Sequence, residues 1–208
     1  MAGVEWGLVV PVKRLGVAKT RLAGYGDRSR QDLALAFALD VVAAALACPV
    51  VVALLVVTDD VRAASALQAA GARIVLDGPD AGLNPALEHG AALLAADRSL
   101  GLASLVADLP SLRSAELASA LATVPPGGRA LVADAAGIGT TLLAAAPGVA
   151  LAPAYGGPSR AGHLRSGAVE LAGGPGLRLD VDTPEDLRAA LALGVGPSTA
   201  AAAAGLRE

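Results

Sequence analysis

An almost unbroken run of Val and Leu side chains, from Val50 to Val57, is the feature that most constrains how this chain can fold. A strand of this kind, without alternating polar residues, is buried on both faces and is typical of the centre of a parallel sheet that helices cover. Strand-like and helical stretches alternate along the rest of the 208 residues. This alternation predicts an α/β fold with a mainly parallel sheet.

The other elements are placed by their apolar runs and by their Gly, Pro and capping residues. The predicted strands cover residues 6–12, 50–57, 73–76, 102–107, 130–133, 140–145 and 177–181. The predicted helices cover residues 29–47 with Ser29 as the N-cap, 61–70, 85–96, 115–122 and 163–171, and a last helix begins at Thr183. We expect residues 1–195 to form a single domain and residues 196–208 to form a flexible tail.

A loop with four basic side chains directly follows the first predicted strand. These side chains are Lys13, Arg14, Lys19 and Arg21. The loop that leaves the carboxyl end of a first parallel strand is the usual position of a ligand in an open α/β sheet. Four cations there favour a polyphosphate ligand, and a solvated surface loop is the alternative that this stretch alone leaves open.

Acidic side chains follow three other predicted strands. Thr58-Asp59-Asp60 and Asp108 each follow an apolar strand, and Asp180 and Asp182 are expected to share one face of the last strand. A single Asp at a strand end is more often a turn former. Mg²⁺, however, is usually held by one or two carboxylates together with substrate phosphates. Three acidic strand ends beside a basic loop therefore favour a metal–phosphate site.

The composition excludes several other classes of protein. A net charge of −3, with only two Tyr, one Phe and one Trp, argues against a nucleic-acid-binding surface. Cys48 is the only cysteine, which excludes an intrachain disulfide and a Cys-based zinc site. There is no basic N-terminal leader and no apolar run long enough to cross a bilayer, so no membrane partner is expected and a cytoplasmic location is predicted.

The motifs of three common alternatives are missing. Lys13-Arg14-Leu15-Gly16 stands where a dinucleotide-binding fold has Gly-x-Gly-x-x-Gly, and Lys19-Thr20 lacks the glycines of a Walker loop. His89 and His163 are the only histidines, and neither adjoins a nucleophile elbow. We expect His89 to be structural, whereas His163 follows a glycine-rich loop and stays a candidate.

Six short motifs follow one another along nearly the whole chain, except for the tail. They are Val10-Pro11-Val12-Lys13, Ala18-Lys19-Thr20-Arg21-Leu22, Gly82-Leu83-Asn84, Ala107-Asp108-Leu109-Pro110, Gly139-Thr140-Thr141 and Asp180-Val181-Asp182-Thr183-Pro184-Glu185-Asp186-Leu187. Each is weak by itself. Together, and in this order, they resemble the phosphoenolpyruvate/2-phospho-L-lactate guanylyltransferases of coenzyme F-420 biosynthesis.

The resemblance implies a three-layer nucleotidyltransferase fold, like that of the nucleotide-diphospho-sugar transferases, with a mainly parallel, mixed central sheet. It also implies an enzyme that transfers GMP from GTP to the phosphate of a small three-carbon acid and releases pyrophosphate. By the same resemblance, Lys13, Lys19 and Arg21 would hold the phosphates of GTP, and Asp59 and Asn84 would lie near the nucleoside.

The family also implies a magnesium site. Asp108 and Asp182, together with Asp180, would bind Mg²⁺, and Asp108 and Lys19 would be the catalytic residues. Arg14 has no matching position in the family and is therefore expected to be a solvated surface residue.

The acceptor acid is expected to bind to hydroxyl and backbone groups. The resemblance assigns this role to Thr140 or Thr141, Gly156 and Ser159. The loop Tyr155-Gly156-Gly157-Pro158-Ser159-Arg160 departs from the family's usual Phe-Gly-Pro-Gly-Ser, because a glycine and the proline have changed places. Gly156 and Ser159 still align, and the backbone donors between them are the part that the departure leaves open.

Two other classes of function stay open from the sequence. One is a nucleotidyltransferase that acts on another small molecule, and the other is a non-catalytic nucleotide-binding module. Within the family, phosphoenolpyruvate, 2-phospho-L-lactate and 3-phosphoglycerate are all candidate acceptors, and the likeness to actinobacterial members favours phosphoenolpyruvate. The preference for guanine rests on the resemblance alone, and a homodimer is neither indicated nor excluded.

Overall fold

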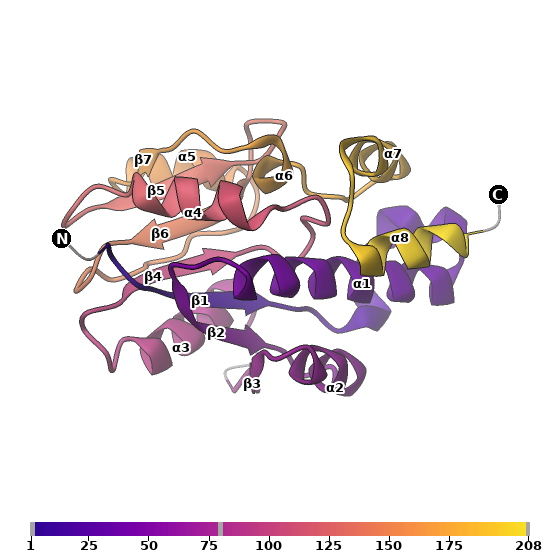
Figure 1. Cartoon of the computed structure of the whole chain (residues 1–208), viewed down its shortest axis with the longest axis horizontal. Coiled ribbons are helices and arrows are strands. Elements are labelled where there is room, and N and C mark those ends of the chain that lie inside the picture. The colour runs from indigo at the N-terminus through magenta and orange to yellow at the C-terminus, as the bar shows by residue number, and fades with distance from the viewer. Residues whose placement is uncertain (1–2, 79–80, 207–208) are drawn as a thin grey trace.

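A seven-stranded sheet forms the centre of the computed structural model, which describes residues 3–78 and 81–206 (Figure 1). The strand order is β3-β2-β1-β4-β6-β5-β7. β6 runs antiparallel to both of its neighbours, and all the other neighbouring pairs are parallel. The predicted α/β fold with a mainly parallel, mixed sheet is therefore confirmed. The strands are β1 (Trp6–Pro11), β2 (Val51–Val57), β3 (Arg73–Val75), β4 (Gly101–Leu105), β5 (Arg129–Ala133), β6 (Thr140–Ala145) and β7 (Val169–Glu170).

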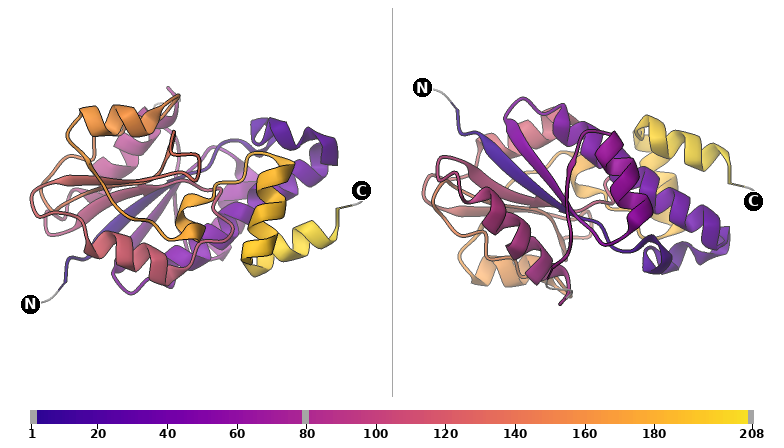
Figure 2. Two further views of the ribbon diagram at one scale, coloured as in Figure 1. Left: turned by 90° about the horizontal axis from the view of Figure 1, so that it is seen from above. Right: turned by 90° about the horizontal axis from the view of Figure 1, so that it is seen from below.

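Helices cover both faces of the sheet, as the two views of Figure 2 show. One face packs against α1 (Asp27–Leu46), α2 (Val61–Ala69), α4 (Ser114–Ala122) and α6 (Pro175–Arg178). The other face packs against α3 (Leu83–Leu94) and α5 (Ser159–Arg165). Two further helices, α7 (Pro184–Leu193) and α8 (Pro197–Ala204), lie beside α1 at the end of the molecule opposite to the N-terminus (Figure 1).

The middle of the sheet is buried on both faces, as the run of Val and Leu in β2 predicts. In β1, Leu8 and Val10 belong to the core under α1, whereas Val9 belongs to the core under α3. Helix α3 lies close to β1 because it presents Gly90 to the strand: a Cβ atom there would come within 2.6 Å of a methyl carbon of Val9. The first turn of α3 is thereby held near the carboxyl end of β1.

The start of the long helix α1 differs from the prediction. Gly26, with a φ of 82°, is the N-cap, and its carbonyl group accepts a hydrogen bond from the N–H of Arg30. The helix therefore begins at Asp27, which places a carboxylate in its first turn. Ser29 lies inside the helix and is not its cap.

Two predicted elements after residue 155 are wrong. The helix begins at Ser159, directly after Pro158, and the left-handed Gly167 (φ 89°) ends it before the edge strand β7. The predicted last strand at residues 177–181 is replaced by the single turn α6, which begins at Pro175. The Arg178 guanidinium donates hydrogen bonds to the carbonyl groups of Ala133 and Asp134, so this segment packs across the end of β5 instead of pairing with a strand.

The expected flexible tail is a packed helix over its described part. Helix α8 lies against α1, and Asp40 of α1 accepts hydrogen bonds from the N–H groups of Ser198 (3.0 Å) and Thr199 (2.8 Å). A carboxylate at this position satisfies the free N–H groups of a helix start and interacts favourably with the helix dipole. The capping group lies 158 and 159 residues away in sequence, so no local pattern could reveal it.

Cys48 is buried, as expected for a small apolar side chain. Within residues 3–78 and 81–206, no helix combines the length and the hydropathy that a membrane span requires.

Candidate active site

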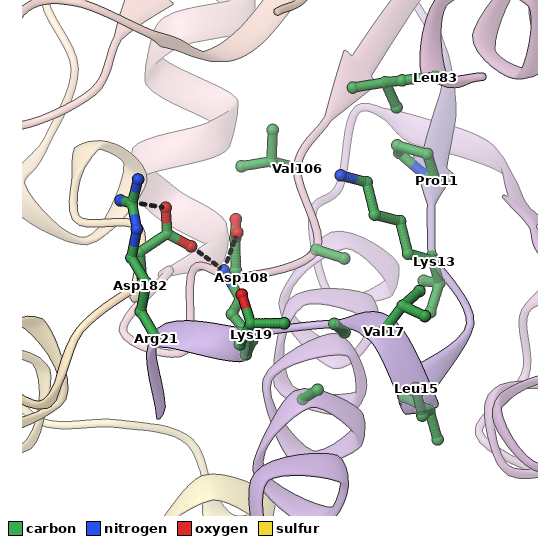
Figure 3. A pocket seen from close by; sticks show the side chains of 15 residues that line it. Pro11, Lys13, Leu15, Val17, Lys19, Arg21, Leu83, Val106, Asp108 and Asp182 are labelled. Atoms are coloured by element: carbon green, nitrogen blue, oxygen red, sulfur yellow. Dashed lines mark hydrogen bonds and ion pairs between the residues drawn. The ribbon is translucent and has the colours of Figure 1, made fainter. Parts of the chain in front are cut away.

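A pocket of about 380 Å³ opens at the carboxyl ends of β1 and β4 (Figure 3). β2 and β3 extend the sheet on one side of β1, and β4 extends it on the other, so the strand order reverses between β1 and β4. Ligands of open α/β sheets bind at such a reversal, because the loops after the two strands diverge and leave a crevice. The lining residues are Pro11, Val12, Lys13, Leu15, Val17, Ala18, Lys19, Thr20, Arg21, Ala34, Leu83, Val106, Ala107, Asp108 and Asp182.

Lys19 joins two acidic segments at one end of this pocket (Figure 3). Its ammonium group donates one hydrogen bond to Asp108 and another to Asp182, where the distance from Nζ to Oδ1 is 2.6 Å. A guanidinium nitrogen of Arg21 lies 3.9 Å from the second carboxylate oxygen of Asp182. Lys19 has a φ of 52°, a conformation that non-glycine residues rarely adopt unless surrounding contacts hold it. The basic loop, the segment after β4 and the segment before α7, which the sequence analysis treated as separate motifs, thus bring two cations and two carboxylates into contact.

The charges in this cluster shift one another's pKa values. Burial by itself would lower the pKa of Lys19, but Asp108 and Asp182 raise it above its ordinary value. Burial works against ionisation of Asp182 as well, yet Lys19, Arg21 and Lys13 lower the pKa of this carboxyl group. Lys19 and Asp182 are therefore both ionised at neutral pH, and this end of the pocket holds fixed charges of both signs.

Asp108 has one carboxylate oxygen that the protein does not satisfy. Its Oδ1 atom is buried and has no hydrogen-bond partner within the described part of the chain. An unpaired buried oxygen is unfavourable, and two carboxylates that converge on one positive charge have the chemistry of a site for a hard divalent cation. No three or more Asp, Glu, His or Cys side chains among residues 3–78 and 81–206 are grouped closely enough to hold a metal ion. Substrate oxygens would have to complete such a site.

Asp180 occupies a different position from the one expected. Because residues 177–181 do not form a strand, Asp180 and Asp182 do not share a strand face, and Asp180 is not among the residues that line the pocket. Burial, and then the nearby charge of Asp108, raise the pKa of the Asp180 carboxyl group to about 7. The adjacent N–H of Val181 donates to the carbonyl group of Asp108, which ties this segment to the β4 loop. The role of Asp180 as a metal ligand stays a prediction.

Arg30, which the sequence analysis did not single out, supports the basic loop from below. This buried side chain of α1 donates hydrogen bonds to the carbonyl groups of Leu15, Gly16 and Ala18. The N–H of Leu15 donates to Asp60, whose second carboxylate oxygen caps α2. No sequence signal points to Arg30, because its burial appears only in the structure and an Arg early in a helix is ordinarily exposed.

A second pocket, of about 220 Å³, adjoins the first along Pro11, Lys13 and Leu83. Asp59 lines it and accepts a hydrogen bond from the N–H of Asp77 at 3.0 Å, and its role near the nucleoside stays a prediction. Arg14 also lines this pocket, where its guanidinium lies 3.6 Å from Asp59, and its side chain is 62% exposed. The prediction that Arg14 is a surface residue thus holds for its exposure but misses its contact with Asp59.

The hydroxyl groups expected to bind the acceptor acid are buried within the protein. Ser159 donates to Oγ1 of Thr140 at 3.2 Å, and Thr140 contacts Nδ1 of His163 at 2.9 Å. Thr141 donates to the carbonyl group of Val132. None of these side chains lines the two pockets described above. Their role in binding the acceptor stays a prediction. In the structure, hydrogen bonds within the protein hold these side chains in place.

His163 is a structural centre of this hydroxyl cluster. Its Nε2 atom accepts a hydrogen bond from the N–H of Ala154 at 2.8 Å, so the proton of the neutral ring is on Nδ1 and faces Thr140. Burial, and then the positive charge of Arg129, lower the pKa of His163 to about 4. A neutral imidazole that is fully used as donor and acceptor positions its neighbours and is not available as a proton carrier at neutral pH.

Asn84 lies beside the expected nucleotide site but contacts the acceptor loop. Its side-chain amide donates to the carbonyl group of Tyr155 and accepts from the N–H of the same residue. Gly156, the next residue, is exposed and has a φ of 116°, which only glycine adopts readily. Asn84 thus holds the backbone of Tyr155, the residue directly before Gly156. The structure does not place Asn84 in the lining of either pocket.

The fold is that of the nucleotidyltransferases. A nucleotidyl transferase from Methanothermobacter thermautotroptrophicus has a TM-score of 0.66 and 21% identity, over 92% of this chain and 98% of that one. A Desulfovibrio desulfuricans protein assigned to the nucleotide-diphospho-sugar transferases has a TM-score of 0.64 and 19% identity, over 88% of this chain and 85% of that one. Similarities at these identities define the fold, and they confirm the predicted nucleotide-diphospho-sugar transferase-like architecture.

The sequence defines the family. The family model described as "Guanylyl transferase CofC like" matches residues 7–201. The phosphoenolpyruvate guanylyltransferase of Thermomonospora curvata is 58% identical over 206 residues, which cover 98% of this chain and 90% of that protein. The phosphoenolpyruvate guanylyltransferase of Streptomyces coelicolor is 58% identical over 207 residues, 98% of each chain. The chain belongs to the CofC-like guanylyl transferase family, which confirms the resemblance inferred from its motifs.

Proposed function

We propose that this protein is a Mg²⁺-dependent enzyme that transfers GMP from GTP to the phosphate of phosphoenolpyruvate, in the biosynthesis of coenzyme F-420. The observation that carries the proposal is the pocket between β1 and β4, where Lys13, Lys19 and Arg21 face Asp108 and Asp182. Relatives that are 58% identical over nearly their whole length are phosphoenolpyruvate guanylyltransferases, which supports the choice of both substrates.

The reaction needs positioning and charge neutralisation more than it needs a base. An oxygen of the acceptor phosphate attacks the α-phosphorus of GTP, and the bond from this phosphorus to the oxygen that bridges to the β-phosphate breaks. Pyrophosphate leaves with the electron pair. The attacking oxygen is already anionic, so no proton has to be removed from it, and the main barrier is the approach of two anions in line.

The basic loop would hold the triphosphate. Lys13 and Arg21 reach the pocket from its two sides, and Lys19 lies between the two carboxylates at its end (Figure 3). In the complex with GTP, the ammonium groups of Lys13 and Lys19 would donate to phosphate oxygens and stabilise the charge that develops on pyrophosphate. Asp59 would lie near the nucleoside in the second pocket.

Asp108 and Asp182 would bind the magnesium ion. The residues fit such an ion, because their carboxylates converge on one positive charge and Oδ1 of Asp108 is otherwise unpaired within the described residues. A bound Mg²⁺ would neutralise phosphate charge and align the two reactants. Thr140, Thr141, Gly156 and Ser159 would bind the three-carbon acid without adding a formal charge to the site. A cytoplasmic location is a prediction that goes with this proposal, and the oligomeric state stays open.

Release of pyrophosphate tests the proposal directly. Purified protein would be incubated with GTP and phosphoenolpyruvate, 2-phospho-L-lactate or 3-phosphoglycerate in turn, with ATP and CTP as control nucleotides and with EDTA as the metal control. We expect release with GTP and phosphoenolpyruvate only, and its loss in EDTA. Release with another acid would identify that acid as the acceptor. Release in EDTA would show that the reaction does not need a divalent metal ion. No release with any pair would favour a non-catalytic nucleotide-binding module.

A further inference from the structure

We propose that Asn84 is a positioning residue that fixes the acceptor loop, residues 154–159, against the nucleotide side of the site. This inference rests on the proposed function for the identity of the two ligands. It replaces the expectation that Asn84 contacts the nucleoside.

The contact of Asn84 with Tyr155 uses both ends of the side-chain amide. Nδ2 of Asn84 donates to the carbonyl oxygen of Tyr155 at 2.9 Å, and Oδ1 accepts from the N–H of Tyr155 at 2.8 Å. A pair of this kind fixes the orientation of the amide, because a flipped amide would place donor against donor and acceptor against acceptor. The two residues are 71 positions apart, so the contact joins two separate parts of the chain.

Asn84 stands on the part of α3 that borders the nucleotide pockets. Its neighbour Leu83 lines both pockets, and Gly82, the N-cap of α3, lines the second one. Helix α3 is held close to the sheet at Gly90, so its first turn has a defined position relative to β1. Asn84 can therefore fix the position of the acceptor loop relative to the nucleotide pockets.

The acceptor loop is held at three further points around Tyr155. The N–H of Ala154 donates to His163, and the aromatic rings of Tyr155 and His163 meet edge to face at a centroid distance of 5.1 Å. The hydroxyl group of Tyr155 lies 2.9 Å from Oγ of Ser104 on β4. The next two residues, Gly156 and Gly157, are exposed and left-handed. The direction of their N–H groups therefore depends on how Tyr155 is fixed.

We call the two hydrogen bonds between Asn84 and the backbone of Tyr155 the Asn84 clamp. Its loss should weaken binding of the acceptor acid and leave binding of GTP unchanged. In Asn84→Ala both hydrogen bonds are lost. In Asn84→Asp the carboxylate still accepts from the N–H of Tyr155 but faces its carbonyl oxygen without a proton to donate. Two hydrogen bonds of ordinary strength correspond to about a tenfold change in the KM of the acid. The exposed Glu88, one turn further along α3, provides the matched control Glu88→Gln.

The test measures three quantities for the wild type, Asn84→Ala, Asn84→Asp and Glu88→Gln. Calorimetry gives the Kd of GTP, initial rates of pyrophosphate release give the KM of phosphoenolpyruvate and kcat, and hydrogen exchange gives the protection of residues 154–159 without any ligand. We expect faster exchange in the loop and a higher KM of the acid in both Asn84 variants, with an unchanged Kd of GTP. A weaker Kd of GTP with an unchanged KM of the acid would overturn the proposal, as would unaltered exchange in the loop.

The exchange measurement separates this inference from the proposed function. If the wild type releases no pyrophosphate with any acid, the proposed function fails, but faster exchange at residues 154–159 in the Asn84 variants would still support the clamp. If the wild type is active and the Asn84 variants exchange and react like Glu88→Gln, the proposed function stands and the clamp is refuted.

Discussion

The two sides of the site are built from different chemistry. On the nucleotide side, Lys13, Lys19 and Arg21 face Asp108 and Asp182, and these side chains line an open pocket. On the acceptor side, the polar groups of Thr140, Ser159 and His163 are neutral and buried. Charges are costly to bury unless they are paired, and here they pair with one another beside an open pocket, where the proposed ligand and metal ion could replace their partners. Neutral hydroxyl and imidazole groups can be buried because hydrogen bonds within the protein satisfy them.

This difference implies two ways of failing. In the proposed function, the nucleotide side acts through charge, and an electrostatic interaction changes little when an atom moves by a fraction of an ångström. The acceptor side acts through the geometry of hydrogen bonds, which weaken steeply with angle and distance. Removal of a charge should therefore reduce turnover on the first side, and removal of a positioning contact should reduce affinity and stability on the second.

The largest effect is expected from Asp108→Asn. This change keeps the size of the side chain and removes the negative charge that faces Lys19. Because the proposed metal ion would lose this carboxylate ligand, we expect turnover to fall by about 10²-fold or more, with the fold intact. Pyrophosphate release gives the rate, and thermal unfolding provides the control for folding. An unchanged rate would remove Asp108 from the mechanism.

Arg30→Met tests whether the nucleotide side also depends on positioning. The change leaves three loop carbonyl groups, those of Leu15, Gly16 and Ala18, without their charged donor. We expect a loss of about 3 kcal/mol in the free energy of unfolding and a higher KM for GTP. Denaturant unfolding and initial rates measure the two effects. The exposed Arg28, on the same helix, gives the matched control Arg28→Met, and equal losses in both variants would contradict this role for Arg30.

His163→Asn tests the acceptor side through the pH dependence of stability. The pKa of His163 is about 4 in the folded protein and about 6.5 in the unfolded chain, so between these values the unfolded state binds more protons. The contribution of His163 to stability should be complete above about pH 6.5 and should fall by up to roughly 3 kcal/mol as the pH decreases towards 4, so the wild type should lose stability relative to His163→Asn over this range. Unfolding curves across this range measure the slope. A slope that is the same in His163→Asn would show that another group causes it.

The smallest effect is expected from Tyr155→Phe. The aromatic ring and the backbone contacts with Asn84 remain, and only the hydrogen bonds of the hydroxyl group with Oγ and the carbonyl group of Ser104 are lost. We expect stability to decrease by about 1 kcal/mol and the KM of the acid to rise less than threefold. Tyr25→Phe, in a separate part of the core, is the matched control. A tenfold rise in the KM of the acid would show that the hydroxyl group itself belongs to the acceptor site.

The sequence predicts the charged side well and the neutral side poorly. Lys13, Lys19, Arg21, Asp108 and Asp182 come from short motifs and all line the first pocket. The basic loop and Asp108 follow the parallel strands β1 and β4, whose carboxyl ends lie at one edge of the sheet, whereas Asp182 follows no strand. Residues that act through long-range contacts have no such pattern. Arg30 looks like any charged residue early in a helix, and the partner of Asn84 lies 71 positions away.

The predicted strand at residues 177–181 failed for a related reason. Leu177 and Val181 are apolar and fully buried, as they would be in a strand. However, Leu177 belongs to the helical turn α6 and packs in the core with α4, and Val181 belongs to the segment after α6 and packs in the core with α1. For the Ala-rich tail the sequence predicted flexibility, and the structure shows the helix α8 instead, whose first turn is stabilised by Asp40 of α1. Local propensity cannot report contacts of this kind, since they form only in the folded chain.

By itself, the sequence determines the class of fold, the family and the charged residues that gather after the strands, because apolar periodicity and short motifs are local properties of the chain. The tertiary structure alone decides how these residues are used: that Lys19 lies between Asp108 and Asp182, that Arg30 supports the basic loop, and that Asn84 holds Tyr155. The physical reason is that hydrogen bonds depend on the distance and angle between atoms, and these are set by packing between distant segments.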